Sequence, residues 1–117
     1  MNRNLPEFVV YLLDLLQSIG PVSAKSMFGG YGVYLDGVMF GLVSENNFYL
    51  KVDAALKPKF LERGLVPFEY PRNGKMIEMS YFQAPEDVFE SLEIMRDWAN
   101  ASYAVALREA RRKSKIR

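Results

Sequence analysis

The chain has 117 residues and a formal net charge of +1; half of its residues are apolar, and it contains neither histidine nor cysteine. The two absences exclude a Ser-His-Asp triad, a cysteine nucleophile, thiolate or imidazole metal sites and disulfides. Any catalysis would have to use carboxylates, lysine, tyrosine or backbone amides with strongly shifted pKa values. The composition therefore favours a binding or interaction protein over an enzyme, and we expect no catalytic residue, cofactor or metal.

The length also bounds the organisation of the chain. It suits one compact domain, which buries enough surface to fold without a disulfide or a metal. No linker-like or repeated stretch divides the sequence, so we expect a single domain over 1–117. The N-terminal residues lead into an amphipathic segment rather than a signal-peptide core, and the apolar runs are too short to span a membrane. We therefore expect a soluble, cytoplasmic protein with no membrane contact.

The first predicted element is an amphipathic helix over 6–19, because apolar residues recur there at steps of three and four. The residues on this face are Leu5, Phe8, Val9, Leu12, Leu13, Leu16 and Ile19. Asn4 can cap the start of the helix and Pro6 fits its first turn. Gly20-Pro21 ends it.

Three antiparallel strands are predicted next, as a meander. Asp36-Gly37 separates two apolar, aromatic-rich runs, which is a strong hairpin signal because both central positions of a type I′ turn need positive φ. The first two strands cover 28–35 and 38–44. Alternating apolar and polar residues then predict a half-buried strand over 48–52.

The following stretch predicts a short helix and two further extended segments. Asp53 can cap a helical turn, and a short helix is expected over 58–64. The segment 66–70 looks extended, with Pro67 favouring an edge position, and a turn then leads to a strand over 76–82.

The C-terminal part of the chain predicts helix. Pro85-Glu86-Asp87 is typical of a helix start, and the apolar residues after it keep helical spacing. We favour a short helix followed by a longer one capped by Ser91 over a single continuous helix. Helices at both ends and about five strands between them predict an α+β fold, an antiparallel sheet flanked by N-terminal and C-terminal helices.

The net charge hides an asymmetry between the end of the chain and the rest. Residues 108–117 hold one acid, Glu109, and six basic residues: Arg108, Arg111, Arg112, Lys113, Lys115 and Arg117. This segment carries a charge of +5, whereas the rest has nine basic and thirteen acidic residues and carries −4. Two interpretations stay open: a solvated helix end, where the helix dipole favours cations, or a basic arm that contacts the phosphates of nucleic acid.

A glycine cluster, Gly29, Gly30 and Gly32, is the first feature that a motif search would find. It is not a dinucleotide-binding fingerprint, because a third spaced glycine and a following helix are missing, and it lacks the Gly-Lys-Ser/Thr ending of a P-loop. A bulge or a close backbone approach in the first strand explains it. The alternative is a surface that needs a bare backbone, at an edge strand or for a ligand.

Most of the polar side chains near the predicted sheet have structural explanations. Asp36 belongs to a turn and Asp53 to a cap, while Glu69 and Glu78 are expected as solvated residues across a hairpin. Five other residues can share the opposite sheet face: Tyr49, Lys51, Arg72, Lys75 and Tyr81. A Tyr–Lys pair can transfer protons, so a ligand site or an unrecognised enzyme is kept as an alternative.

Aromatic residues are concentrated on or beside the strands, and the strand 38–44 is apolar on both faces. One account is a helix on each side of the sheet. Another is a dimer or partner surface, because exposed apolar patches mark interfaces. A third is stacking of nucleic-acid bases, against which the negative body of the chain argues.

An ordered set of these stretches resembles the TfoX/Sxy N-terminal domain family. The run MFGGYGVYLDGVMF resembles the opening signature of the family and contains Met27, Phe28, Gly29, Gly30, Tyr31, Gly32, Asp36 and Gly37. The resemblance continues through FYLKVD, PFEY, GK, MSYF and PEDV, which include Lys51, Asp53 and Tyr81. It closes with Trp98 and the alanine-rich last helix, and it covers about residues 5 to 112.

This resemblance implies a non-enzymatic bacterial regulator of natural competence for DNA transformation. Named members of the family act with the cyclic-AMP receptor protein at a subset of promoters and have a second, C-terminal domain, where this chain has its basic segment. We therefore expect a regulatory domain that contacts a protein partner, a transcription factor of the cyclic-AMP receptor type, and that forms a homodimer. The alternatives are direct nucleic-acid binding through 108–117, and small-ligand binding or enzymatic activity.

Overall fold

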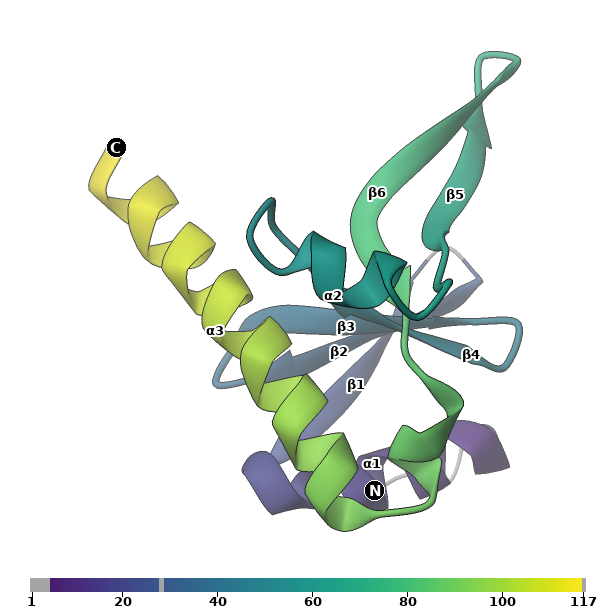
Figure 1. The fold of residues 1–117 in the computed structure, drawn as a ribbon, viewed down its shortest axis with the longest axis vertical. Helices are drawn as coiled ribbons and strands as arrows, with labels where there is room; N and C mark the ends of the chain where they lie inside the picture. The colour runs from purple at the N-terminus through teal and green to yellow at the C-terminus, as the bar shows by residue number, and fades with distance from the viewer. Residues whose placement is uncertain (1–4, 28, 117) are drawn as a thin grey trace.

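Over the residues that it describes, 5–27 and 29–116, the computed structural model is a six-stranded antiparallel sheet with helices at both ends, which confirms the α+β class (Figure 1). The elements in chain order are α1 (Glu7–Leu16), η1 (Gln17–Ile19), β1 (Val22–Met27), β2 (Gly30–Leu35), β3 (Val38–Ser44), β4 (Asn47–Lys51), α2 (Lys57–Leu61), β5 (Pro67–Arg72), β6 (Lys75–Gln83), η2 (Glu86–Phe89) and α3 (Leu92–Ile116). The strand order is β1-β2-β3-β4-β6-β5, so β1 and β5 form the two edges.

The N-terminal helix forms where the apolar spacing predicts it. The residues that α1 buries are Val9, Leu12, Leu13 and Leu16. The 3₁₀ turn η1 extends the helix to Ile19, and Gly20, at φ 142°, lets the chain turn into the sheet. Pro6 occupies the N-cap position without a side-chain bond, and the predicted cap, Asn4, lies outside the described residues.

Strand β1 was not predicted. The sheet therefore has six strands rather than about five, and β1 and β2 form an additional hairpin before the predicted one. A single strand was expected over 28–35, whereas the chain pairs β1 with β2 and turns at Gly29, which has φ 80°. Three of the six residues of β1 are exposed, and its sequence, VSAKSM, has a single β-branched residue. Pairing with β2 rather than local propensity therefore makes it a strand. Phe28 lies outside the described residues.

The predicted meander is confirmed in β2, β3 and β4. Asp36 and Gly37 have φ of 52° and 77°, as a type I′ turn requires. Val33 and Tyr34 pair with Gly41 and Met39, so the register shift places a bulge in β3 at Phe40. The chain then turns at Glu45 and Asn46 into β4.

The second half of the chain follows the predicted order. β5 lies at the edge of the sheet, as Pro67 indicated, and Glu69 pairs with Glu78 across the β5–β6 hairpin. The expected break before the last helix is also present, because the Ile94 amide donates to the Ser91 hydroxyl oxygen at 3.3 Å. The basic segment belongs to α3, which continues to Ile116, so over the described residues it is a helix end rather than an extended arm.

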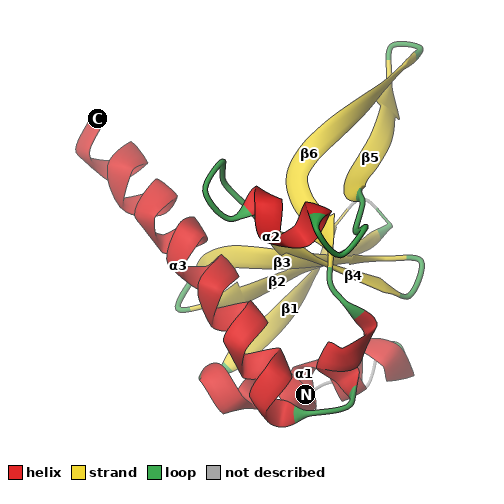
Figure 2. Cartoon of the chain, in the orientation of Figure 1, coloured by secondary structure: helices red, strands yellow, loops and turns green. Residues whose placement is uncertain are grey.

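The helices α1, α2 and α3 bury one continuous apolar core against a single face of the sheet (Figure 2). Strand residues at alternate positions supply the sheet side of this core, among them Val33, Leu35, Phe48, Leu50 and Phe82. Phe60 of α2 packs edge-on against Trp98 of α3, with the ring centroids 4.9 Å apart. The strand residues that alternate with these core residues point to the opposite face of the sheet, which we call the second face. Among them are Tyr34, Leu42, Tyr49 and Tyr81, which are not part of the core cluster. Over the described residues the helices therefore cover one face of the sheet, which differs from the alternative of a helix on each side.

No helix in the described part of the chain is both long enough and apolar enough to cross a lipid bilayer.

Replacing Gly30 with alanine tests the predicted close backbone approach, which the structure confirms. A Cβ at Gly30 would overlap the carbonyl oxygen of Val43, which is backbone and cannot move aside. We expect Gly30→Ala to lower the free energy of unfolding, measured by urea denaturation, by about 1–3 kcal/mol.

Gly32→Ala is the matched control. A Cβ there would meet the sulfur atoms of Met27 and Met39 and the ring edge of Tyr34, at 2.9–3.2 Å. Because methionine side chains can shift, the loss of stability should be smaller. Equal stability of Gly30→Ala and the wild type would contradict the close approach.

Candidate functional site

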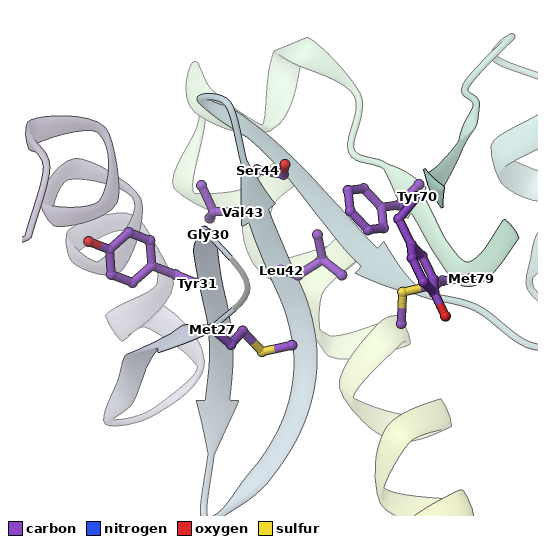
Figure 3. A pocket seen from close by; sticks show the side chains of 9 residues that line it. Met27, Gly30, Tyr31, Leu42, Val43, Ser44, Tyr70 and Met79 are labelled. Atoms are coloured by element: carbon purple, nitrogen blue, oxygen red, sulfur yellow. The ribbon is translucent and has the colours of Figure 1, made fainter. Parts of the chain in front are cut away.

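An apolar groove of about 290 Å³ lies on the second face of the sheet, under the β5–β6 hairpin, which we call the arm. One wall comes from β1, β2 and β3 and consists of Met27, Gly30, Tyr31, Leu42, Val43 and Ser44. The other wall comes from the arm and consists of Phe68, Tyr70 and Met79. Figure 3 shows Met27 and Leu42 on one side of the space and Tyr70 and Met79 on the other.

The curvature of the sheet brings these two walls together. Phe68, Tyr70 and Met79 occupy one face of the arm, and a register shift between Pro67 and Glu69 sits where the arm leaves the body. Bulges of this kind bend a strand and re-aim its side chains. The rings of Phe68 and Tyr49 then meet edge to face at 5.2 Å and join the arm to β4 beneath the groove.

The lining of the groove decides what it can bind. As far as the structure describes it, the lining contains no lysine, arginine, aspartate or glutamate, and its side-chain hydroxyls are those of Ser44 and Tyr70, because the Tyr31 side chain points away from the space, towards the core (Figure 3). Met27 and Met79 add unbranched, polarisable side chains that adapt to different apolar shapes. The groove therefore suits apolar or aromatic groups, and it has no acid–base pair for chemistry.

The glycine signature explains how one wall of the groove can form. Gly30 brings the start of β2 against the end of β3 without a side chain, and Gly32 is buried beside the sulfur of Met27. Of the residues that carried the family resemblance, Met27 and Gly30 line the groove directly, whereas Tyr31 borders it and points its side chain towards the core (Figure 3).

Lys51 lies outside the groove, in a charged contact between β4 and α3. Its ammonium donates to the Ser80 hydroxyl at 2.8 Å, pairs with Glu109 at 3.1 Å, and lies 5.2 Å from the centre of the Tyr81 ring. Burial raises the pKa of Tyr81 to about 12, and the charges of Tyr34 and Glu109 act in the same direction. Tyr81 therefore keeps its proton at neutral pH. This arrangement fastens α3 to the sheet and leaves Lys51 occupied, so the suggested Tyr–Lys proton transfer finds no support.

Asp53 has the capping role that was predicted, and it also binds the end of α3. Its carboxylate accepts the Leu56 amide at 2.8 Å and pairs with Arg108 at 3.1 Å. The backbone hydrogen bond from Leu56 lowers the pKa of Asp53, and Arg108 adds to this effect. Asp53 and Lys51 together anchor neighbouring residues of α3.

The basic residues of 108–117 do not all have the same surroundings. Arg108 is engaged with Asp53, whereas Arg111, Arg112 and Lys113 are exposed on the turns of α3 that follow. Lys115 is within α3, but its side chain is outside what the structure describes, as is Arg117 altogether. Contact of this segment with nucleic acid stays a prediction.

Sequence reasoning missed the groove because its walls are distant along the chain. Leu42, Phe68, Tyr70 and Met79 were recognised only as strand residues. The alternation of Phe68 with Tyr70 shows that they share a face, but no local pattern shows that this face folds back over Leu42.

The pH dependence of stability tests the anchoring role of Asp53. Because its pKa is lowered in the folded state, its contribution is complete above the unfolded pKa and is lost as the pH falls. At pH 7, Asp53→Ala should lower the free energy of unfolding by about 1 kcal/mol, the usual value of a cap. The difference from the wild type should shrink between roughly pH 5 and pH 2.

Arg108→Gln is the control for this experiment. Its side chain is 61% exposed in the ion pair, so its removal should cost less than removal of the cap. A difference between wild type and Asp53→Ala that did not change with pH would contradict the role of the carboxylate charge.

Comparison with known proteins places these features in a family. The family model for the TfoX N-terminal domain matches residues 14–106, which include the groove and Lys51. The chain is 26% identical to the DNA transformation protein TfoX1 of Aliivibrio fischeri over 73 residues, 62% of this chain and 35% of that protein. It is 24% identical to Protein Sxy of Escherichia coli over 84 residues, 71% of this chain and 40% of that protein. The chain thus spans less than half the length of these relatives.

Proposed function

The chain belongs to the TfoX N-terminal domain family, and from this premise we propose that it is a non-enzymatic regulatory domain that binds a protein partner through the groove. The partner is a transcription factor of the cyclic-AMP receptor type, and the complex acts in the cytoplasm in the regulation of DNA transformation. One relative is named a DNA transformation protein, which supports this process.

The observation that carries the proposal is the position and chemistry of the groove. It is lined by signature residues of the family, Met27 and Gly30, and it lies on the sheet face that the helices leave open. Interfaces are centred on desolvated apolar and aromatic anchors, and methionine and tyrosine are enriched in them. An apolar or aromatic side chain of the partner, flanked by groups that bond to the hydroxyls of Ser44 and Tyr70, would fit this lining.

The surroundings of the groove support binding rather than catalysis. The lining that the structure describes holds no aspartate, glutamate, lysine or arginine, and Tyr81, with a pKa of about 12, stays protonated. An enzyme working at neutral pH would need a general acid or base tuned towards that pH.

Met79→Glu tests the groove as a binding site. It places a charge in the apolar lining from the arm, where the half-buried side chain has room to turn towards solvent. We expect this variant to fold and to lose the partner from a pull-down of the native cytosol, and to weaken binding of the purified partner at least tenfold by calorimetry, which is about 1.4 kcal/mol.

Leu61→Glu is the matched control for Met79→Glu. Leu61 lies on α2, away from the groove, and is 53% exposed, so the same change of charge there should leave binding intact. Capture of the same partner by both variants would show that the groove is not the binding site.

A further inference from the structure

The arm carries two cross-strand pairs of like charge. Glu69 lies opposite Glu78, and Arg72 lies opposite Lys75. Like charges directly opposite one another destabilise a hairpin. Within the described part of the chain, none of these four exposed side chains takes part in an ion pair. The arm therefore bears charges that no ion pair of the described residues offsets.

The two glutamates lie on the face of the arm that turns away from the groove. Alternation along the strands puts Glu69 and Glu78 on the same side as Pro71 and Met76, opposite the side that lines the groove. Met76 is 60% exposed, more than the other large apolar side chains found on the surface. We call this face, Glu69, Glu78, Pro71 and Met76, the outer face of the arm. It combines a double negative charge with an exposed apolar side chain.

A complementary surface lies at the end of α3. Arg108 pairs with Asp53 and Glu109 pairs with Lys51. Among the described residues of α3, these are the last two that form ion pairs with the rest of the chain. Arg111, Arg112 and Lys113 follow and are exposed. We call these three residues the basic helix end.

The relative positions of these two surfaces allow a symmetric contact. The arm and the end of α3 extend from the same end of the molecule, with α2 between them (Figure 1). A two-fold axis at that end would place the basic helix end of one copy beside the arm of the other, and the same contact would form a second time. Such a self-complementary arrangement is what a closed dimer requires.

We propose that the chain forms a two-fold homodimer in which the basic helix end of each copy packs on the outer face of the other copy's arm. The cations offset the Glu69–Glu78 repulsion, and the methylene stems of the arginines cover Met76. The asymmetry between the −4 body and the +5 segment then has a role within the assembly. This inference goes beyond the proposed function, because the groove lies on the other side of the arm and stays open.

Nucleic acid is the competing partner for the same three cations. Phosphate contacts would use Arg111, Arg112 and Lys113 equally well. They would leave the paired glutamates and Met76 unexplained, and the second copy accounts for both surfaces at once.

Charge reversal on the full chain tests the dimer by sedimentation equilibrium at low salt. The wild type should be a dimer. An arm variant, Glu69→Lys with Glu78→Lys, and a helix variant, Arg111→Glu with Arg112→Glu and Lys113→Glu, should each dissociate to monomers, with the dissociation constant raised at least tenfold. Mixed in equal amounts, they should form a heterodimer, because each arm then meets a helix end of opposite charge. All changed positions are exposed, and circular dichroism checks the fold of each variant.

The controls separate this proposal from its alternatives. Asp14→Lys with Glu93→Lys changes two exposed acids outside the arm by the same total charge and should leave the dimer unchanged. A monomeric wild type, or a mixture of variants that stays monomeric, overturns the proposal. The proposal is also overturned if the wild type is a monomer that binds a short DNA duplex and if only the helix variant fails to bind this duplex. The Met79→Glu experiment tests the groove as the partner site and not the dimer, so the two proposals can fail independently.

Discussion

The close approach of β2 to β3 at Gly30 is the constraint on which the second face of the sheet depends. The carbonyl oxygen of Val43 occupies the space that a side chain would need, so the two strands meet there through bare backbone. β1 then returns beside β2, and Met27 lies opposite Gly30 in the pairing. One wall of the groove is therefore built from backbone and thioether, and the arm can fold towards it. A larger residue would force the strands apart and open the groove.

The two faces of the sheet have different roles. The helix side holds the apolar core, where Phe60, Phe82 and Trp98 pack in edge-on contacts. The second face carries tyrosines and the groove with its methionines, and the arm partly covers it. Lys51 and Asp53 couple these sides, because they fix the last anchored turn of α3 to the end of β4. That attachment directs the basic helix end away from the core, where it can meet another molecule.

Features that depend on a few neighbouring residues could be predicted from the sequence. The Asp36-Gly37 turn needs positive φ at both positions, Asp53 caps the turn after β4, and Ser91 separates η2 from α3. β1 could not be predicted, because pairing with β2 rather than its own sequence makes it a strand. The groove depends on the bend of the arm over Leu42, a contact between distant strands. Glu69 and Glu78 were expected across a hairpin, but the direction in which their face points is set by the whole sheet.

Methyl resonances of methionine give the most direct test of the central claim, that the second face binds the partner. Met27 and Met79 line the groove, Met95 is fully buried in the core, and Met76 lies on the outer face of the arm. When the purified partner is added to the methyl-labelled chain, the account predicts that the signals of Met27 and Met79 shift while that of Met95 keeps its position. Unchanged Met27 and Met79 signals in a partner complex would contradict it.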